Sequence, residues 1–211
     1  VSAEEGDIVK TGLGVYNYKY SEFLTAKTPY MFASFSWRSL RHRPLGLVIP
    51  FPKEDFGGWK DESLTGALDF RGAENRIQTV FHNDYLLDNG FLTMGMIKRG
   101  WGKQVWMATQ LLMFASLPDG RTCILYDRVT SDVDVEVTLN RGLGYFLEND
   151  LLNGNKRTIT FGEEEIEVQG LGGEAREIPV RARRLKIDNA ISIYADPARL
   201  VYMDSSERND N

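Results

Sequence analysis

The sequence predicts an all-β protein: a large antiparallel β-sandwich of about a dozen strands with little helix. Many short segments alternate apolar and polar residues, the pattern of half-buried strands. Gly, Pro, Asn and Asp separate these segments at intervals of about 8–12 residues, as is typical of sandwiches and barrels. Long helical patterns are missing from the sequence, and the best helical stretch, Ser63 to Leu68, spans barely two turns.

The clearest single strand is predicted from Asp132 to Leu139, where the valines occupy every second position. The best hairpin consists of Val105–Leu117, the turn residues Pro118-Asp119-Gly120, and the returning run Thr122–Val129. A helix is the rival interpretation of its first half, which also fits helical spacing. Because that half is apolar on both sides, we expect a central strand that is covered on both faces.

Further strands are expected at Tyr30–Leu40, Leu45–Phe51, Asn75–Leu86, Phe91–Lys98, Leu143–Leu147, Arg157–Phe161, Glu165–Gln169, Ile178–Ile187, Ala190–Tyr194 and Leu200–Met203. All-β chains of this length commonly form one unit. We therefore expect a single sandwich domain over residues 1–203, followed by a polar tail at 204–211.

Composition excludes several classes of protein. The chain has 211 residues, 42% hydrophobic and 26% charged, as in ordinary globular domains. The net charge of −5 argues against a nucleic-acid partner. No apolar run approaches the ~20 residues of a membrane-spanning helix, so we expect a soluble chain and no membrane partner. The compartment stays open. The chain begins at Val1 without a signal-peptide pattern, so we expect a piece of a longer, bacterial protein with neighbouring domains.

Metal, redox and cofactor chemistry are not expected. The single cysteine, Cys123, excludes an internal disulfide framework, and its apolar neighbours predict a small buried hydrophobe. His42 and His82 are the only histidines. The sequence contains no glycine-rich phosphate loop, no nucleophile elbow, no paired-histidine zinc motif and no acidic calcium loop. We predict neither a cofactor nor a metal site.

His82 lies in the densest polar cluster, Phe81 to Tyr85. One interpretation makes His82 a general base that Asp84 orients, with Tyr85 as a proton donor. In the other, the cluster is a turn in which His82 caps a strand, because Asn-Asp pairs favour turns. The second interpretation carries more weight, and both stay open.

Two charged segments also have two interpretations each. The run from Arg38 to Arg43, with Arg41 near its centre, is suited to binding an anion through guanidinium groups, or is a solvated turn. The acidic row Asp132, Asp134 and Glu136 offers oxygen ligands for calcium. We favour instead a cross-strand salt ladder with the row of Arg181 and Arg183.

Aromatic residues suggest carbohydrate binding. Tyr16, Tyr18 and Tyr20 alternate and so share one side of a strand, while Trp59 and Trp101 lie beside glycines in expected loops. An exposed ring stacks on the apolar C–H face of a sugar. The competing interpretation, which we favour, places the tyrosines at a core edge and uses the tryptophans to plug the ends of the sandwich.

Two segments resemble a known family. Leu112–Val129 is similar to a recurrent hairpin of β-supersandwich domains of the galactose-mutarotase-like, polysaccharide-lyase-associated type. Arg184–Asn189, leading into Ile191–Tyr194, resembles the late strand pair of those domains. The resemblance implies an association with carbohydrate. Lyases of this group often draw catalytic residues from a separate helical domain, and no catalytic residue is carried over to this chain.

The resulting prediction is a non-catalytic or accessory carbohydrate-associated domain. Trp59 and Trp101 would stack on the sugar, and Arg41 and His82 would contact its polar groups. The alternative is a sugar-active enzyme, a mutarotase-like isomerase or a lyase, with His82 as base and Asp84 or Tyr85 assisting. A third possibility is a structural module that packs against partner domains.

Overall fold

The computed structural model describes residues 12–38, 44–51, 64–65, 67–70, 75–101, 105–131, 133–145, 156–169, 176–179, 182–195 and 199–202. The chain divides into two compact units, Val1–Phe146 and Leu147–Asn211. Every strand pairing in the described residues is antiparallel.

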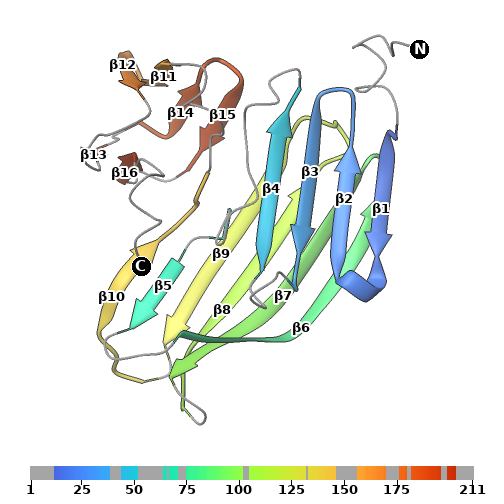
Figure 1. Cartoon of the computed structure of the whole chain (residues 1–211), viewed down its shortest axis with the longest axis vertical. Helices are drawn as coiled ribbons and strands as arrows, with labels where there is room; N and C mark the ends of the chain where they lie inside the picture. Colours follow the sequence, from blue (N-terminus) through green and yellow to red (C-terminus); the bar gives the residue numbers. More distant parts are fainter. Residues whose placement is uncertain are drawn as a thin grey trace. The chain divides into compact units, whose positions relative to one another are not determined.

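The first unit contains two four-stranded sheets (Figure 1). One sheet has the order β1-β2-β3-β4, with β1 at Gly14–Tyr18, β2 at Phe23–Lys27, β3 at Met31–Ser36 and β4 at Leu45–Pro50. The other has the order β6-β7-β8-β9, with β6 at Asn75–Leu87, β7 at Gly90–Trp101, β8 at Val105–Ser116 and β9 at Cys123–Ser131. A single 3-10 turn, η1 (Lys19–Ser21), joins β1 to β2. A smaller sheet pairs β5 (Ala67–Phe70) with β10 (Val137–Arg141).

The core of the first unit lies between its two four-stranded sheets. Leu24 and Phe35 come from the first sheet, Phe91 and Phe114 come from the second, and all four side chains are buried in one cluster. The rings of Phe35 and Phe114 stack across the interface with centroids 5.4 Å apart. The predicted all-β antiparallel sandwich with little helix is therefore confirmed.

The second unit is built from shorter strands. One sheet has the order β12-β11-β14-β15, with β11 at Lys156–Phe161, β12 at Glu164–Gln169, β14 at Arg184–Ile187 and β15 at Ile191–Tyr194. The other pairs β13 (Arg176–Pro179) with β16 (Arg199–Tyr202). Ile159, Phe161 and Val168 form a small core. Arg157, almost fully buried, donates to Asp188 at 2.8 Å and holds the β14–β15 turn.

The predicted central hairpin is confirmed as β8 and β9. Its turn is held by Asp119, whose carboxylate accepts hydrogen bonds from the backbone N–H groups of Arg121 and Thr122. The rival helix is wrong, since β8 pairs with a strand on each side. The expectation of cover on both faces is also wrong, because Leu111 on the outer side of β8 is 40% exposed.

Two strand predictions need correction. Only Val137–Arg141 of the region around Asp132–Leu139 is a strand: the Ser131 hydroxyl donates to the Val133 carbonyl at 2.6 Å, and the residues from Val133 to Glu136 are not paired in a sheet. Leu68, at the end of the most helical stretch of the sequence, lies in strand β5. The predicted strand from Leu143 has no strand pairing up to Tyr145.

The predicted strand Ile178–Ile187 is also wrong, because it contains parts of two strands, β13 and β14. The predictions of domain organisation are not decided by the described residues. A single domain over 1–203 stays a prediction, and the tail at 204–211 lies outside the described residues. No helical segment in the described part of the chain has the length and apolar character that crossing a bilayer requires.

Candidate ligand-binding site

A shallow aromatic concavity lies on the outer side of the β1–β4 sheet. In β2, Leu24 and Ala26 point into the core, so the alternate residues Phe23, Thr25 and Lys27 point outward. Antiparallel pairing sets Tyr16 opposite Thr25 and Tyr18 opposite Phe23. The period-two repeat of β1 and the register of β1 on β2 therefore place these aromatic rings together outside the core.

The rings form a continuous surface. Tyr16 and Tyr18 are 44% and 51% exposed, and their ring centroids lie 6.4 Å apart with planes inclined by 28°. Phe23 continues the row, 5.8 Å from Tyr18. The open concavity beside them has a volume of about 560 Å³. It is lined by Gly12, Tyr16, Tyr18, Ser21, Phe23, Thr25, Lys27 and Phe32.

Polar groups lie among the rings. Ser21, Thr25 and Lys27 belong to the lining; Thr25 is only 6% exposed, and the Lys27 Nζ is 6.0 Å from the centroid of the Phe51 ring. Hydroxyl and ammonium groups donate hydrogen bonds, while the rings offer flat apolar area. This combination suits a ligand with one apolar face and a rim of hydroxyl groups.

The sequence predicted that Tyr16, Tyr18 and Tyr20 form a stripe on one side of a strand. The favoured interpretation, which placed this tyrosine stripe at a core edge, was wrong. Tyr16 and Tyr18 do share a strand face, yet they lie on the exposed side and not at a core edge. Tyr20 leaves the stripe, because it belongs to η1 and is fully exposed. Gly14, with φ of +142°, precedes the stripe, and a Cβ at that position would touch the Tyr16 ring.

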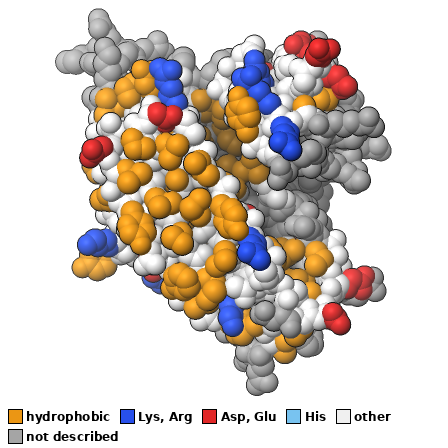
Figure 2. Space-filling model, turned by 180° about the vertical axis from the view of Figure 1, so that it is seen from behind, with side chains coloured by type: hydrophobic (Ala, Val, Ile, Leu, Met, Phe, Trp, Pro, Cys, Tyr) orange, Lys and Arg blue, Asp and Glu red, His pale blue; other side chains and the backbone are white. Residues whose placement is uncertain are grey.

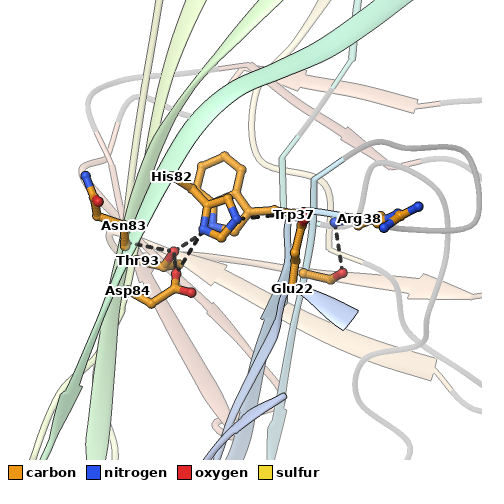
Figure 3. A network of polar contacts seen from close by, with 8 residues as sticks. Glu22, Trp37, Arg38, His82, Asn83, Asp84 and Thr93 are labelled. Atoms are coloured by element: carbon orange, nitrogen blue, oxygen red, sulfur yellow. Dashed lines mark hydrogen bonds and ion pairs between the residues drawn. The ribbon is translucent and has the colours of Figure 1, made fainter. Parts of the chain in front are cut away.

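His82 belongs to a second candidate site, a polar network between the two four-stranded sheets (Figure 3). Its Nδ1 lies 3.4 Å from an Asp84 carboxylate oxygen, and its Nε2 lies 3.7 Å from a carboxylate oxygen of Glu22. The Thr93 hydroxyl donates to the same Asp84 oxygen at 2.6 Å and accepts from the Trp37 indole N–H at 2.6 Å. The four polar side chains and the indole thus form one connected chain of contacts.

A β-bulge sets this arrangement. The β6–β7 register shifts between Thr79 and Phe81. Beyond the shift, His82 and Asp84 point inward, whereas Phe81 and Tyr85 point outward and are about half exposed. His82 therefore meets Asp84, as predicted, but Tyr85 lies on the opposite side of the sheet and cannot assist it. The cluster is also not a turn, because all of it lies within β6.

Packing holds the imidazole flat against the indole. The rings of Trp37 and His82 lie 5.4 Å apart with planes only 13° from parallel. Gly95, the cross-strand partner of His82, leaves the room, since a Cβ there would come within 2.7 Å of the indole. The His82 side chain keeps 21% of its surface exposed. The geometry orients His82 through Asp84 and satisfies the buried indole N–H of Trp37.

A third polar cluster was not predicted. Arg99 donates through Nε to the Gln110 amide oxygen at 2.7 Å, and Gln110 donates to both Asp127 carboxylate oxygens at 2.9 Å. Arg99 and Gln110 are buried. Burial raises the pKa of Asp127, against the lowering effects of Gln110 and Arg99. No short motif marks these residues in the sequence, because they come together only through the pairing of β7, β8 and β9.

Three other predicted site residues have no described side chain. Arg41 and Trp59 lie outside the described residues. Trp101 is the last residue of β7, paired with Val105, rather than a loop residue, and its side chain is not described. Burial raises the pKa of the Cys123 thiol to about 12, and Cys123 packs against the core, as expected of a small hydrophobe. In the part of the chain that the structure describes, no group of three metal-binding side chains is found.

No protein-family model, no curated protein and no solved structure matches this chain.

Proposed function

We propose that this chain is a non-catalytic, carbohydrate-associated β-sandwich that binds saccharide in the aromatic concavity of the β1–β4 sheet. The observation that carries the proposal is the exposed row of Tyr16 and Tyr18 rings beside the hydroxyls of Ser21 and Thr25. It replaces the predicted pair Trp59 and Trp101 as the stacking surface.

The chemistry of a pyranose ring supports this assignment. Such a ring has an apolar face of C–H groups and an equatorial rim of hydroxyls. Tyr16 and Tyr18 offer neighbouring aromatic faces, so two adjacent sugar units have one ring each to stack on. Ser21, Thr25 and Lys27 lie around the same concavity and supply hydrogen-bond partners for the rim. The open shape suits an extended chain rather than an enclosed monosaccharide.

Glycan-array screening followed by titration calorimetry tests the proposal. We expect an oligosaccharide to bind, and each of Tyr16→Ala and Tyr18→Ala to raise its Kd about tenfold. The reason is that removal of a stacking ring costs about 1.5 kcal/mol. The double variant should lose detectable binding.

Tyr85→Ala is the matched control, because Tyr85 and Tyr18 are both 51% exposed but lie on different sheets. Its Kd should equal that of the wild type. Equal losses at Tyr18 and Tyr85 would contradict a site in the concavity. Absence of binding to any glycan would overturn the proposal and favour the third possibility, a structural interaction module.

A sugar-active enzyme is the second candidate, and the contact of His82 with Asp84 favours it. A carboxylate beside Nδ1 orients the imidazole, and Nε2, 3.7 Å from a Glu22 carboxylate oxygen, would then act as the general base. Turnover of a sugar substrate that disappears in His82→Ala, with an unchanged circular dichroism spectrum, would support this candidate. Turnover that persists in the variant would leave the network with a structural role only.

A further inference from the structure

The outer side of the β6–β9 sheet carries a second surface, which the proposed saccharide site does not use. Residues that alternate with core residues along each strand point to this side. Cross-strand pairing arranges them in three rows: Tyr85-Leu92-Ala115-Ile124, Asn83-Met94-Met113-Tyr126 and Phe81-Met96-Leu111-Arg128. We call these rows the apolar face. Figure 2 shows hydrophobic side chains gathered on this side of the molecule.

The apolar face is both hydrophobic in composition and largely exposed. All its residues except Asn83 and Arg128 are apolar, and none of them is acidic. Phe81, Tyr85, Met94, Leu111, Ile124 and Tyr126 are each between 40% and 51% exposed. The row that follows along the strands is polar and contains Lys98, Thr109 and Thr130. A contiguous exposed apolar patch of this kind marks an interaction surface.

We infer that the apolar face binds the apolar face of a second copy of this chain, across a two-fold axis parallel to the strands. Such an axis keeps each row opposite itself and reverses the strand order, so β6 faces β9 of the second copy. Phe81 then faces Arg128 of the other copy, and Asn83 faces Tyr126. The guanidinium meets an aromatic ring, and the amide meets a phenol hydroxyl.

This complementarity selects the axis. A two-fold axis perpendicular to the strands would set β6 against β6 and reverse the order of the rows. Arg128 would then face Ile124, leaving its charge against an aliphatic side chain. With the parallel axis, both polar side chains of the apolar face have a partner, and the Met94 and Met113 side chains meet at the centre. Two packed sheets accommodate such an arrangement when their strand directions differ by about −30° and the sheets lie about 10 Å apart.

The size of the face sets the strength of the dimer. Four strands about 4.8 Å apart and three rows about 6.8 Å apart cover roughly 20 by 20 Å. That is below the ~800 Å² per partner of a standard interface. We therefore expect a reversible dimer that dissociates at micromolar concentrations.

Sedimentation velocity over a micromolar concentration series tests this dimer. We expect the wild-type chain to shift from monomer to dimer, and Met94→Lys to raise the dissociation constant at least about tenfold, because it places an unpaired ammonium at the centre of the interface. Val133→Lys is the matched control, since Val133 is 47% exposed and lies outside the apolar face. A wild type that stays monomeric, or equal effects of the two lysines, would overturn the inference.

A pair of substitutions at Phe81 tests the axis. Phe81→Glu would place a carboxylate opposite Arg128 of the second copy, whereas Phe81→Lys would place a like charge there. We expect the dissociation constant of Phe81→Lys to exceed that of Phe81→Glu at least about tenfold, and the difference to shrink in high salt. Equal constants would overturn this mode of association. Circular dichroism of each variant verifies that the exposed substitutions leave the fold intact.

Discussion

The two outer faces of the first unit differ although one core supports both. The face of the β1–β4 sheet is hollowed, and Ser21, Thr25 and Lys27 lie among its rings. The apolar face of the β6–β9 sheet lacks such a mixture, and Asn83 and Arg128 are its only polar side chains. Period-two alternation predicts polar residues on the outer side of any sandwich sheet. The two departures from that rule are of different kinds and suit different partners: a hydroxylated ligand on one face and another protein surface on the other.

The shared core gives the largest expected effect. Phe114 is buried between the sheets and stacks on Phe35, while Leu111 lies on the same strand but on the apolar face. We expect Phe114→Ala to lower the free energy of unfolding by about 3–5 kcal/mol, because it leaves a cavity. Leu111→Ala should cost about 1 kcal/mol or less. Urea denaturation of the monomer measures the free energy of unfolding of both variants. Similar losses in the two variants would contradict the prediction that only the Phe114 side of β8 is packed in the core.

The second-largest effect is expected at the hydrogen bond between Trp37 and Thr93, which links the two sheets. Thr93→Val keeps the shape of the side chain but removes the partner of the Trp37 indole and a hydrogen bond to Asp84. We expect a loss of about 1–3 kcal/mol, because the indole N–H stays buried without an acceptor. Thr130→Val is the control, because the exposed Thr130 hydroxyl makes only a long 3.4 Å hydrogen bond to the Thr109 carbonyl. It should change the free energy of unfolding by less than about 0.5 kcal/mol.

A double-mutant cycle separates this link from simple packing. In a Trp37→Phe background the donor is gone, so Thr93→Val should cost less than it does in the wild type by about 0.5 kcal/mol or more. Additive costs would mean that the Trp37–Thr93 hydrogen bond does not contribute to the stability of the sandwich.

Local pattern was enough to predict the architecture. Turn residues at 118–120 and the apolar runs around them predicted the β8–β9 hairpin, because those signals lie within a few residues of one another. The same reasoning failed at Val133 and Val137, where alternation suggested a buried face but both side chains are nearly half exposed. Alternation reports which residues share a side, and the pairing partner decides whether that side is covered.

The candidate sites depended on information that the sequence does not hold locally. His82 and Asp84 were paired correctly because residues two apart share a strand side. The same alternation places Tyr85 on the opposite side, but the sequence interpretation grouped it with His82 because the cluster was not expected to lie within a strand. The contact of this cluster with Trp37 joins separate strands and has no local signal in the sequence. The sequence predicted the Tyr16–Tyr18 row correctly. It could not predict that the two rings are exposed, because exposure depends on which segments cover the β1–β4 sheet.

The smallest expected effect concerns two acidic residues, Asp127 within β9 and Asp119 in the turn that precedes this strand. Burial raises the pKa of Asp127, which points inward, whereas hydrogen bonds from Thr122 and Arg121 lower the pKa of Asp119 in the turn. For Asp127 the folded state binds the proton more tightly than the unfolded state does, so stability falls as pH rises through the folded pKa. For Asp119 the sign is opposite, and its contribution is lost as pH falls through its lowered pKa.

The variants Asp127→Asn and Asp119→Asn should therefore move stability in opposite directions at neutral pH. Relative to the wild type, Asp127→Asn gains stability, by less than about 1 kcal/mol because solvent screens the carboxylate, and the gain vanishes in acid. Asp119→Asn loses stability at neutral pH and approaches the wild type in acid. Urea midpoints measured between neutral and acidic pH check both signs. A loss of stability in Asp127→Asn would contradict this prediction. It would mean that the hydrogen bonds from Gln110 stabilise the charged carboxylate by more than its burial destabilises it. The inward side of β9 would then be stabilised by a charge, although its outer side is apolar.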